Sequence, residues 1–117
     1  MEEYIMTIDE GTTSARAVLF NKDSEIIAIC AKEFAQYYPQ PGWVEQDPKE
    51  IWLTTKEVIN RVVLQAGIDP RQIKAAGITN QRETVVVYDK NTGEPVYNAI
   101  GWADRRTAPY CDELKAA

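Results

Sequence analysis

The feature that most constrains the fold is one long amphipathic helix placed between segments with the character of β-strands. Asp47 stands at its N-cap, Pro48 occupies the first helical position, and Glu50 is placed to complete a capping box. Gly67 marks the end of the helix. The apolar positions on one helical face are Ile51, Val58, Ile59, Val62, Val63 and Ala66. A helix of this length between strands predicts a right-handed crossover, and therefore a mixed sheet in an α/β fold.

The strands themselves are indicated by apolar runs on both sides of the helix. Two runs within residues 4–20, joined by an acidic turn that contains glycine and hydroxyl groups, predict a strand, a tight loop and a returning strand. Residues 26–31 follow a polar turn and predict a third strand, so the simplest arrangement is a three-strand antiparallel meander. Residues 73–79 are small and apolar, which predicts a parallel, central strand covered on both faces.

The remaining segments predict smaller elements. Residues 33–44 are rich in aromatic residues and proline, which favours an ordered loop that covers the sheet over one that contacts a ligand directly. Residues 84–88 and 94–97 flank a turn and predict a second hairpin. A last helical pattern contains Tyr110, Cys111 and Leu114, and either Asp104 or Thr107 would cap it. No repeat or internal domain boundary is evident.

Charge and composition exclude several classes of function. The chain has 117 residues, 44% of them hydrophobic, which suits one domain with a real core. Its formal net charge of -5 argues against nucleic acid or an anionic membrane as the main partner. No apolar run approaches the length of a membrane span, and Glu2 and Glu3 stand where a signal peptide would be basic, so we expect a cytoplasmic protein.

Histidine is absent, so acid–base chemistry must use carboxylates. Cys30 and Cys111 are isolated, and we expect both to be reduced and without a functional role.

The turn inside the first hairpin has the composition of a phosphate site. Gly11 lets the backbone approach a ligand closely, and backbone N–H groups in a tight turn can converge on an anion. The side chains suited to phosphate oxygens are those of Thr12, Thr13, Ser14 and Arg16. Asp9 would be repelled by phosphate unless a cation or water stood between them, so it predicts Mg²⁺, bound directly or through water. The alternative is an ordinary hairpin in which the same residues only form the turn.

A second polar group follows the strand predicted at residues 73–79. Arg82 and Glu83 lie in a polar segment at the end of that strand, where open α/β sheets bind their ligands. The alternative is a solvated salt bridge in a loop.

Four segments read together resemble the FGGY family of carbohydrate kinases: residues 9–16, 42–48, 77–84 and 102–107. The resemblance extends over residues 4–117, and the last two segments look like the glycerol-phosphorylating branch of the family. It implies a ribonuclease-H-like, actin-type ATPase fold. It also implies that the chain is an incomplete N-terminal, polyol-binding domain, with no counterpart of the family's C-terminal domain in this sequence.

The same resemblance implies an activity and a set of site residues. The activity is ATP-dependent phosphorylation of glycerol to sn-glycerol 3-phosphate by a homo-oligomeric enzyme that uses ATP and Mg²⁺. Asp9 matches the acidic residue of the magnesium region. The implied nucleotide-phosphate contacts are Thr12, Thr13, Ser14 and Arg16. The implied glycerol contacts are Arg82, Glu83, Trp102 and Thr12, with Trp102 packing on the carbon backbone of the triol.

Three departures from the family pattern keep alternatives open. Glu10 stands where glutamine is usual, which adds negative charge beside the phosphate turn. Gly101 and Ala103 flank Trp102 where larger residues are usual, so a related sugar or pentulose kinase is an alternative. The family's catalytic aspartate would lie beyond Ala117, so we expect no catalytic residue here and no activity from the isolated chain, and a non-catalytic binding module is a further alternative.

Overall fold

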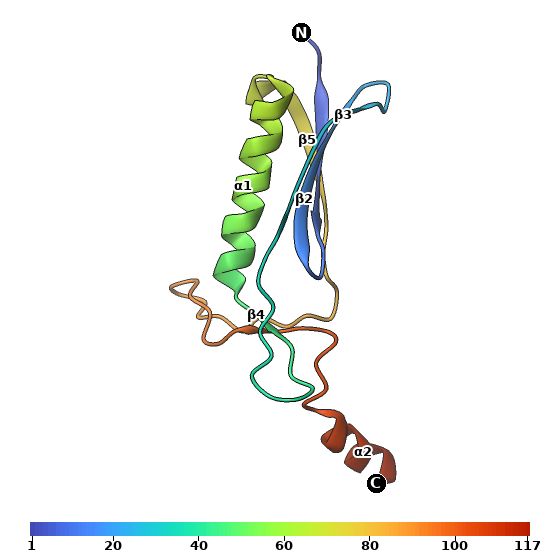
Figure 1. Ribbon diagram of the computed structural model, residues 1–117, viewed down its shortest axis with the longest axis vertical. Coiled ribbons are helices and arrows are strands. Elements are labelled where there is room, and N and C mark those ends of the chain that lie inside the picture. The colour runs from blue at the N-terminus through green and yellow to red at the C-terminus, as the bar shows by residue number, and fades with distance from the viewer. The chain divides into compact units, whose positions relative to one another are not determined.

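A computed structural model describes residues 1–117. The chain forms two compact units, a subdivision that the sequence did not suggest. We call Met1–Phe34 with Lys49–Gln81 the sheet unit, and Ala35–Pro48 with Arg82–Ala117 the loop unit. Each unit is described by itself below, and Figure 1 shows the elements of both.

The sheet unit contains a four-stranded mixed sheet and one long helix. The strands are β1 (Tyr4–Glu10), β2 (Ser14–Asn21), β3 (Ile26–Glu33) and β5 (Ile73–Thr79), in the order β3-β2-β1-β5. β1 and β2, and β2 and β3, pair in antiparallel fashion, whereas β5 pairs parallel to β1. Helix α1 (Pro48–Ala66) connects β3 toward β5 and lies along one side of the sheet (Figure 1). The predicted meander, crossover helix and parallel strand are therefore confirmed.

Alternating residues of the meander face α1 and form the core. Successive side chains of a strand point to opposite faces, so every second residue is buried. The strand residues in this core are Tyr4, Met6, Ile8, Ala15, Ala17, Leu19, Ala28 and Cys30. Val58 and Val62 of α1 are fully buried against them, and Ile59, Val63 and Ala66 are partly buried, as the apolar pattern predicts. Fully burying each such aliphatic side chain contributes roughly 1.5–3 kcal/mol.

The boundaries of α1 follow the predicted signals. The helix begins at Pro48 and ends at Ala66. Gly67 then adopts a left-handed backbone with φ of 66°, and its N–H donates to the carbonyl oxygens of Val63 and Leu64 at 3.1 Å. A left-handed residue at this position favours glycine because it has no Cβ.

The prediction that residues 73–79 form a central strand covered on both faces is wrong. β5 occupies these residues, but it lies at the edge of the sheet, and every residue from Lys74 to Thr79 is exposed. Only β1 pairs with it, and the core beneath α1 is made by the meander, with Ile73 alone contributing from β5. The composition indicated a strand, but it carried no information about the neighbours of that strand.

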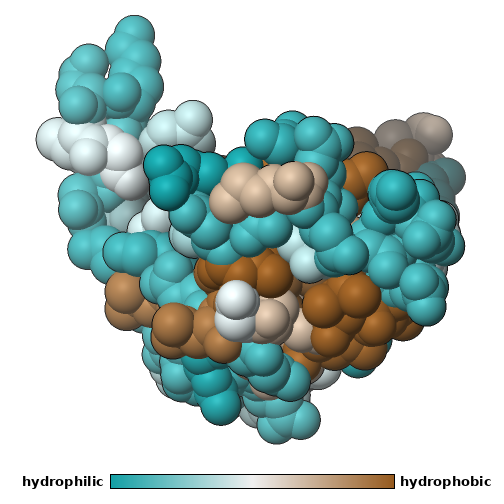
Figure 2. Space-filling view, turned by 90° about the horizontal axis from the view of Figure 1, so that it is seen from above, coloured by the Kyte–Doolittle hydropathy of each residue, from teal (hydrophilic) through white to brown (hydrophobic).

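Hydrophobic side chains are also exposed on the side of the meander that faces away from α1. Ile5, Ile27 and Ile29 are 40–49% exposed, and they alternate with the core residues of β1 and β3. Figure 2, which views the molecule from above, shows brown hydrophobic surface lying between teal hydrophilic areas. No helix is long and apolar enough to cross a membrane.

The loop unit is held by a very short two-stranded sheet. β4 (Glu45–Gln46) pairs in antiparallel fashion with β6 (Ala99–Ile100). Isolated bridges add Tyr37 beside Glu45 and Val85 beside Ile100. The chain then enters α2 (Ala108–Ala116), with Thr107 at the N-cap position and Pro109 in the first turn, which decides between the two predicted caps. The Thr107 side chain makes no capping hydrogen bond.

The second predicted hairpin is present only as a turn and one bridge. The Asp89 N–H donates to the Glu94 carbonyl at 2.8 Å, and Gly93 has a positive φ of 76°. Next to this turn Tyr88 and Pro95 form an isolated bridge, but residues 84–88 and 94–97 form no strand. Pro95 has no N–H to donate, so a regular ladder cannot continue through it. The aromatic loop was predicted over residues 33–44, and residues 35–44 of it belong to the loop unit, so its role as a cover for the sheet stays a prediction.

Candidate functional site

The turn between β1 and β2 is a tight backbone structure. The Gly11 N–H donates to the Ser14 carbonyl at 2.9 Å, and the Thr13 carbonyl accepts from the Phe34 N–H at 3.1 Å. A Cβ built on Gly11 would lie 3.0 Å from the Ser14 carbonyl oxygen, which is tighter than most Cβ contacts, so the Ser14 backbone would have to move by a few tenths of an ångström. The closeness of this turn therefore favours glycine at this position. Thr13 is exposed, and Thr12 and Ser14 are partly exposed, so the turn presents hydroxyl groups at the surface.

Asp9 and Arg16 lie opposite each other next to this turn. They are cross-strand partners in the register of β1 and β2, and Asp9 also pairs with Thr79 of β5. Both alternate with core residues, so they lie on the side of the sheet away from α1, and both are exposed. The structure thus brings together the five residues predicted for phosphate and metal: Asp9, Thr12, Thr13, Ser14 and Arg16.

The single carboxylate near this turn suits Mg²⁺, which takes most of its ligands from water and phosphate, better than it suits a metal ion that is held by protein side chains alone. No group of three or more Cys, Asp or Glu side chains gathers anywhere in the chain in a way that could hold a metal ion. Mg²⁺ commonly uses one or two carboxylates and takes its other ligands from water and substrate phosphates. A single exposed carboxylate beside a phosphate turn, as at Asp9, fits that mode.

Glu10 differs from Asp9 because its side chain contacts α1. Its Oε1 accepts a hydrogen bond of 2.6 Å from the Thr55 hydroxyl, while its Oε2 is buried without a hydrogen-bond partner. Thr55 Oγ1 also lies 2.8 Å from the Ile51 carbonyl oxygen. A hydroxyl has one proton, so the two acceptors share it. The extra negative charge expected beside the phosphate turn is thus directed toward the helix side of the sheet.

Arg82 and Glu83 form an exposed turn in the loop unit. Glu83 has a left-handed backbone with φ of 68°, although it is not glycine. This conformation costs a non-glycine residue about 1–2 kcal/mol. Strained residues of this kind gather at functional sites, where the surrounding structure fixes them. The strain therefore supports a functional interpretation of this turn over a merely solvated salt bridge.

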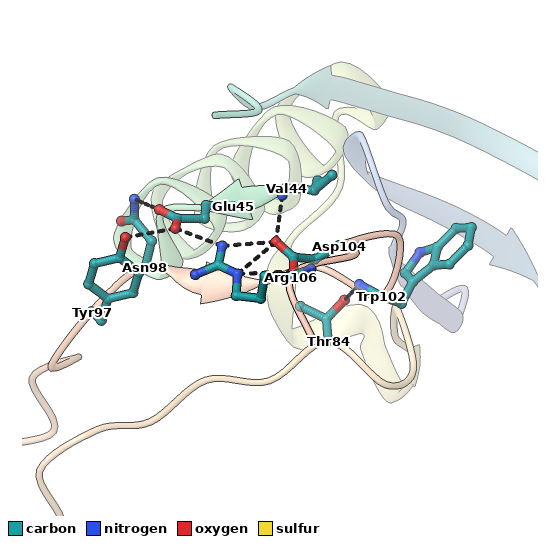
Figure 3. Close-up of polar contacts among 8 residues, drawn as sticks. All are labelled: Val44, Glu45, Thr84, Tyr97, Asn98, Trp102, Asp104 and Arg106. Carbon is teal, nitrogen blue, oxygen red and sulfur yellow. Dashed lines mark hydrogen bonds and ion pairs between the residues drawn. The ribbon is translucent and has the colours of Figure 1, made fainter. Parts of the chain in front are cut away.

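Trp102 is brought next to this turn. Its backbone N–H donates to Thr84 Oγ1 at 3.2 Å (Figure 3). Val85 and Ile100 exchange two backbone hydrogen bonds of 3.0 Å. The Trp102 side chain is about half exposed, at 55%. The loop unit therefore places three of the four residues of the predicted polyol site, Arg82, Glu83 and Trp102, on two adjoining segments, whereas Thr12 belongs to the sheet unit. Their roles stay predictions, as does the meeting of this group with the phosphate turn.

A buried charged network lies beside Trp102, and sequence reasoning missed it. Glu45, only 1% exposed, accepts hydrogen bonds from the Tyr97 hydroxyl at 2.7 Å, Asn98 Nδ2 at 3.1 Å and Arg106 Nη2 at 2.8 Å (Figure 3). Arg106 also binds both carboxylate oxygens of Asp104, through Nε at 3.0 Å and Nη2 at 2.8 Å. We call Glu45, Tyr97, Asn98, Asp104 and Arg106 the arginine network.

The arginine network sets the charge state of its carboxyl groups. Hydrogen bonds from the Arg106 side chain lower the pKa of Asp104 from 3.8 to about 2, against the opposing effect of burial. Burial by itself would raise the pKa of Glu45, but hydrogen bonds from Tyr97, Arg106 and Asn98 overcome it, and the pKa is lowered. The bond to Asp104 is the main cause that raises the pKa of Arg106. All three groups are therefore charged at neutral pH.

The signal that could have revealed this network was present in the sequence. Glu45 lies in one of the four recognisable segments and Asp104 and Arg106 in another, but Glu45 and Arg106 were given no role and Asp104 only that of a possible helix cap. A charged residue inside an otherwise apolar or aromatic segment is buried only when it is paired. The pairing itself spans 61 residues, so only the folded structure identifies the partners.

Comparison with known proteins identifies the family. The model of the N-terminal domain of the FGGY family of carbohydrate kinases matches residues 4–117, and the chain belongs to this family. The chain is 59% identical over 115 residues to the glycerol kinase of Chromobacterium violaceum. The aligned residues make up 98% of this chain and 23% of that protein. It is 57% identical over 115 residues to the glycerol kinase of Carboxydothermus hydrogenoformans, with the same coverage.

Solved structures agree with the fold. The crystal structure of Plasmodium falciparum glycerol kinase with ADP matches with a TM-score of 0.87 and 32% identity, over 98% of this chain and 23% of that one. Gluconate kinase from Lactobacillus acidophilus matches with a TM-score of 0.89 and 27% identity, over 99% of this chain and 23% of that one. The predicted resemblance and its actin-type fold are thus confirmed. The chain spans about a quarter of the length of the relatives it matches.

Proposed function

We propose that this chain supplies the N-terminal part of an ATP-dependent glycerol kinase. The reaction would transfer the γ-phosphoryl group of ATP to a terminal hydroxyl of glycerol and yield sn-glycerol 3-phosphate. The observation that carries the proposal is the 59% identity to a glycerol kinase over 98% of the chain. The grouping of Arg82, Glu83 and Trp102 on adjoining segments supports it from the side of the substrate.

The phosphate turn would bind and orient the nucleotide phosphates. The hydroxyls of Thr12, Thr13 and Ser14 would donate to phosphate oxygens, and the Arg16 guanidinium would add a charge-assisted contact. Asp9 would hold Mg²⁺, directly or through water, and the ion would neutralise charge on the phosphates. That the Plasmodium relative was solved with ADP supports a nucleotide as the ligand.

The polyol residues would bind glycerol at both kinds of hydroxyl atom. Arg82 carries only donors and would bind hydroxyl oxygens, whereas Glu83 carries only acceptors and would bind hydroxyl hydrogens. The exposed Trp102 ring would pack against the carbon chain. Thr12 would lie near the phosphate of the product. Together these contacts would hold one terminal hydroxyl in place for in-line transfer.

The chain supplies positioning but no base for the hydroxyl proton. None of the predicted site residues matches the catalytic aspartate of the family. We infer that the 117 residues do not phosphorylate glycerol by themselves, and that the complete enzyme is a cytoplasmic homo-oligomer. The net charge of -5 is in keeping with partners that are small molecules rather than nucleic acid or membrane.

A related sugar kinase is the second candidate, favoured by the fold match to gluconate kinase. The features that raised this alternative were the small residues Gly101 and Ala103 on either side of Trp102. A Cβ on Gly101 would lie 3.4 Å from Val44 Cγ1, which is ordinary van der Waals contact, and the Gly101 N–H donates to the Val44 carbonyl at 2.9 Å. Packing on Val44 therefore does not require glycine at this position, and the substrate comparison below decides between the two candidates.

The test is a chimeric enzyme in which these 117 residues replace the corresponding segment of the Chromobacterium violaceum glycerol kinase. Steady-state rates are measured with glycerol, a pentulose and gluconate, each with ATP. We expect glycerol to have the highest kcat/KM. Equal turnover of a pentulose or gluconate would favour the second candidate, and a folded chimera inactive on all three would contradict the proposal. The isolated chain is assayed in parallel, and glycerol turnover by it would contradict the inference that it is inactive alone.

A further inference from the structure

Trp102 lies on a short segment that is fixed on both sides by the same strand region. On its N-terminal side, β6 pairs with β4, and the Gly101 N–H donates to the Val44 carbonyl at 2.9 Å. On its C-terminal side, Asp104 Oδ2 accepts from the Val44 N–H at 2.7 Å. The segment that carries Trp102 is thus a loop whose two ends meet at Val44.

Arg106 joins these two ends through side chains. Its Nη2 lies 2.8 Å from Glu45 Oε2 on β4 and 2.8 Å from Asp104 Oδ2, two residues beyond Trp102. The guanidinium also stacks on the Trp43 ring, with 3.9 Å between the guanidinium carbon and the ring centroid. Arg106 therefore bonds to the strand before the loop and to the loop itself.

The chemistry of this contact is specific to arginine. The side chains of Glu45 and Asp104 are 2% and 3% exposed, and Arg106 is the cation that both contact. A guanidinium presents several N–H donors in one plane, so it can bind both carboxylates at once, whereas an ammonium acts as a point charge. Lysine at this position would keep the charge but lose the planar bridge and the flat stacking surface on Trp43.

We propose that Arg106 is a positioning residue of the polyol site, acting on Trp102 through Glu45 and Asp104. The contact between the Trp102 N–H and Thr84 Oγ1 carries this order to the turn of Arg82 and Glu83. The proposal rests on the proposed function only in naming glycerol as the molecule that Trp102 contacts. The ordering of the Trp102 loop by Arg106 is independent of any substrate.

The first experiment measures the loop in the 117-residue chain without a ligand. The chain contains three tryptophans, Trp43, Trp52 and Trp102, so labelling with 5-fluorotryptophan gives three ¹⁹F signals, which single Trp→Phe variants assign. Arg106→Lys is compared with Arg105→Lys, a matched change at the exposed neighbouring residue. We expect Arg106→Lys to shift or broaden the Trp43 and Trp102 signals and to leave Trp52, which lies on α1, unchanged. Arg105→Lys should leave all three signals unchanged.

The second experiment measures KM in the chimeric glycerol kinase described above. We expect Arg106→Lys to raise KM for glycerol about tenfold and to leave KM for ATP unchanged. The reason is that a misplaced Trp102 would weaken the binding of the substrate that it contacts. An unchanged Trp102 signal in the first experiment, or equal rises in both KM values in the second, would overturn the proposal. If the parent chimera does not phosphorylate glycerol, the proposed function fails, and the ¹⁹F signals still decide whether Arg106 orders the loop.

Discussion

The phosphate turn and the arginine network are built by opposite means. The turn is a backbone structure in which Gly11, Ser14 and Thr13 make short-range or neighbouring-strand hydrogen bonds, and its candidate ligand groups are exposed. In the network, the buried Glu45 side chain and the partly buried Arg106 side chain fix a loop through charge. In the turn, most side chains can change with little loss of stability, whereas a Cβ on Gly11 would crowd the Ser14 carbonyl oxygen. In the network, the loss of one charged side chain leaves its buried partners unpaired, which lowers stability.

The largest expected effect tests the network by removing its cation. Arg106→Met keeps much of the side-chain volume but leaves the buried carboxylates of Glu45 and Asp104 without their cation, which costs about 3–5 kcal/mol. Hydrogen exchange at the Val44 and Gly101 amides measures the loss of local stability. Arg105→Met is the control, with an expected change within about 0.5 kcal/mol. Unchanged protection in Arg106→Met would show that the network does not stabilise the loop unit.

The second effect is the pH dependence of the network. The pKa of Asp104 is depressed from 3.8 to about 2, so its contribution to stability is fully present above the unfolded value and is lost as the pH falls through about 2. At about 1.4 kcal/mol per pKa unit, the contribution is about 2 kcal/mol. The free energy of unfolding of the loop unit is measured from about pH 5 to about pH 1, the range over which a carboxylate of this kind loses its contribution. In Asp104→Asn this part of the pH dependence should disappear, and an identical profile in both proteins would contradict the assignment.

The third effect tests the turn by adding one methyl group. Gly11→Ala brings a Cβ to 3.0 Å from a backbone oxygen, which should destabilise the sheet unit by about 1–3 kcal/mol through overpacking. Gly77→Ala on β5 is the control, because nothing lies within 4 Å of its built Cβ. The control should be neutral or slightly stabilising, since alanine loses less entropy on folding. Urea unfolding measures both, and equal midpoints would mean that the turn is more adaptable than its geometry implies.

The smallest effect concerns Glu10 beside the turn. Its Oε2 is buried without a partner, and an unpaired buried charge costs more than an unpaired amide. Glu10→Gln should therefore stabilise the sheet unit by about 1 kcal/mol at neutral pH. The exposed Glu33 offers the control change Glu33→Gln, which should have no measurable effect. A loss of stability in Glu10→Gln would indicate that the carboxylate has a donor in solution.

The same contrast explains how much the sequence could predict. The helix Pro48–Ala66, the hairpin around Gly11 and the turn at residues 89–93 depend on local signals, and these predictions are confirmed. The exposed, edge position of β5 depends on which strands pair with it, and local composition does not report that. The strands β4 and β6 have two residues each, too few for a pattern of alternation. The candidate residues of the turn could be proposed as one group because they are close together in the sequence.

The contacts that the sequence could not reveal all join distant residues. Glu45 and Arg106 are 61 positions apart, and Thr55 and Glu10 are 45 apart. The residues of each pair are polar and at least partly buried, whereas a sequence pattern predicts that polar residues lie at the surface. The turn of Arg82 and Glu83 was predicted from its place after a strand, but its neighbour Trp102 was assigned from the family resemblance alone.

The central claim is that the phosphate turn and the turn of Arg82 and Glu83 bind different substrates of one reaction. Paired variants of the chimeric kinase test this claim directly. Arg82→Ala should raise KM for glycerol at least about tenfold with KM for ATP unchanged, because a site built to hydrogen-bond hydroxyls loses its donor. Arg16→Ala should raise KM for ATP and leave KM for glycerol unchanged. If both variants raised the same KM, or if neither changed any KM, the account of these regions as polyol and phosphate sites would be contradicted.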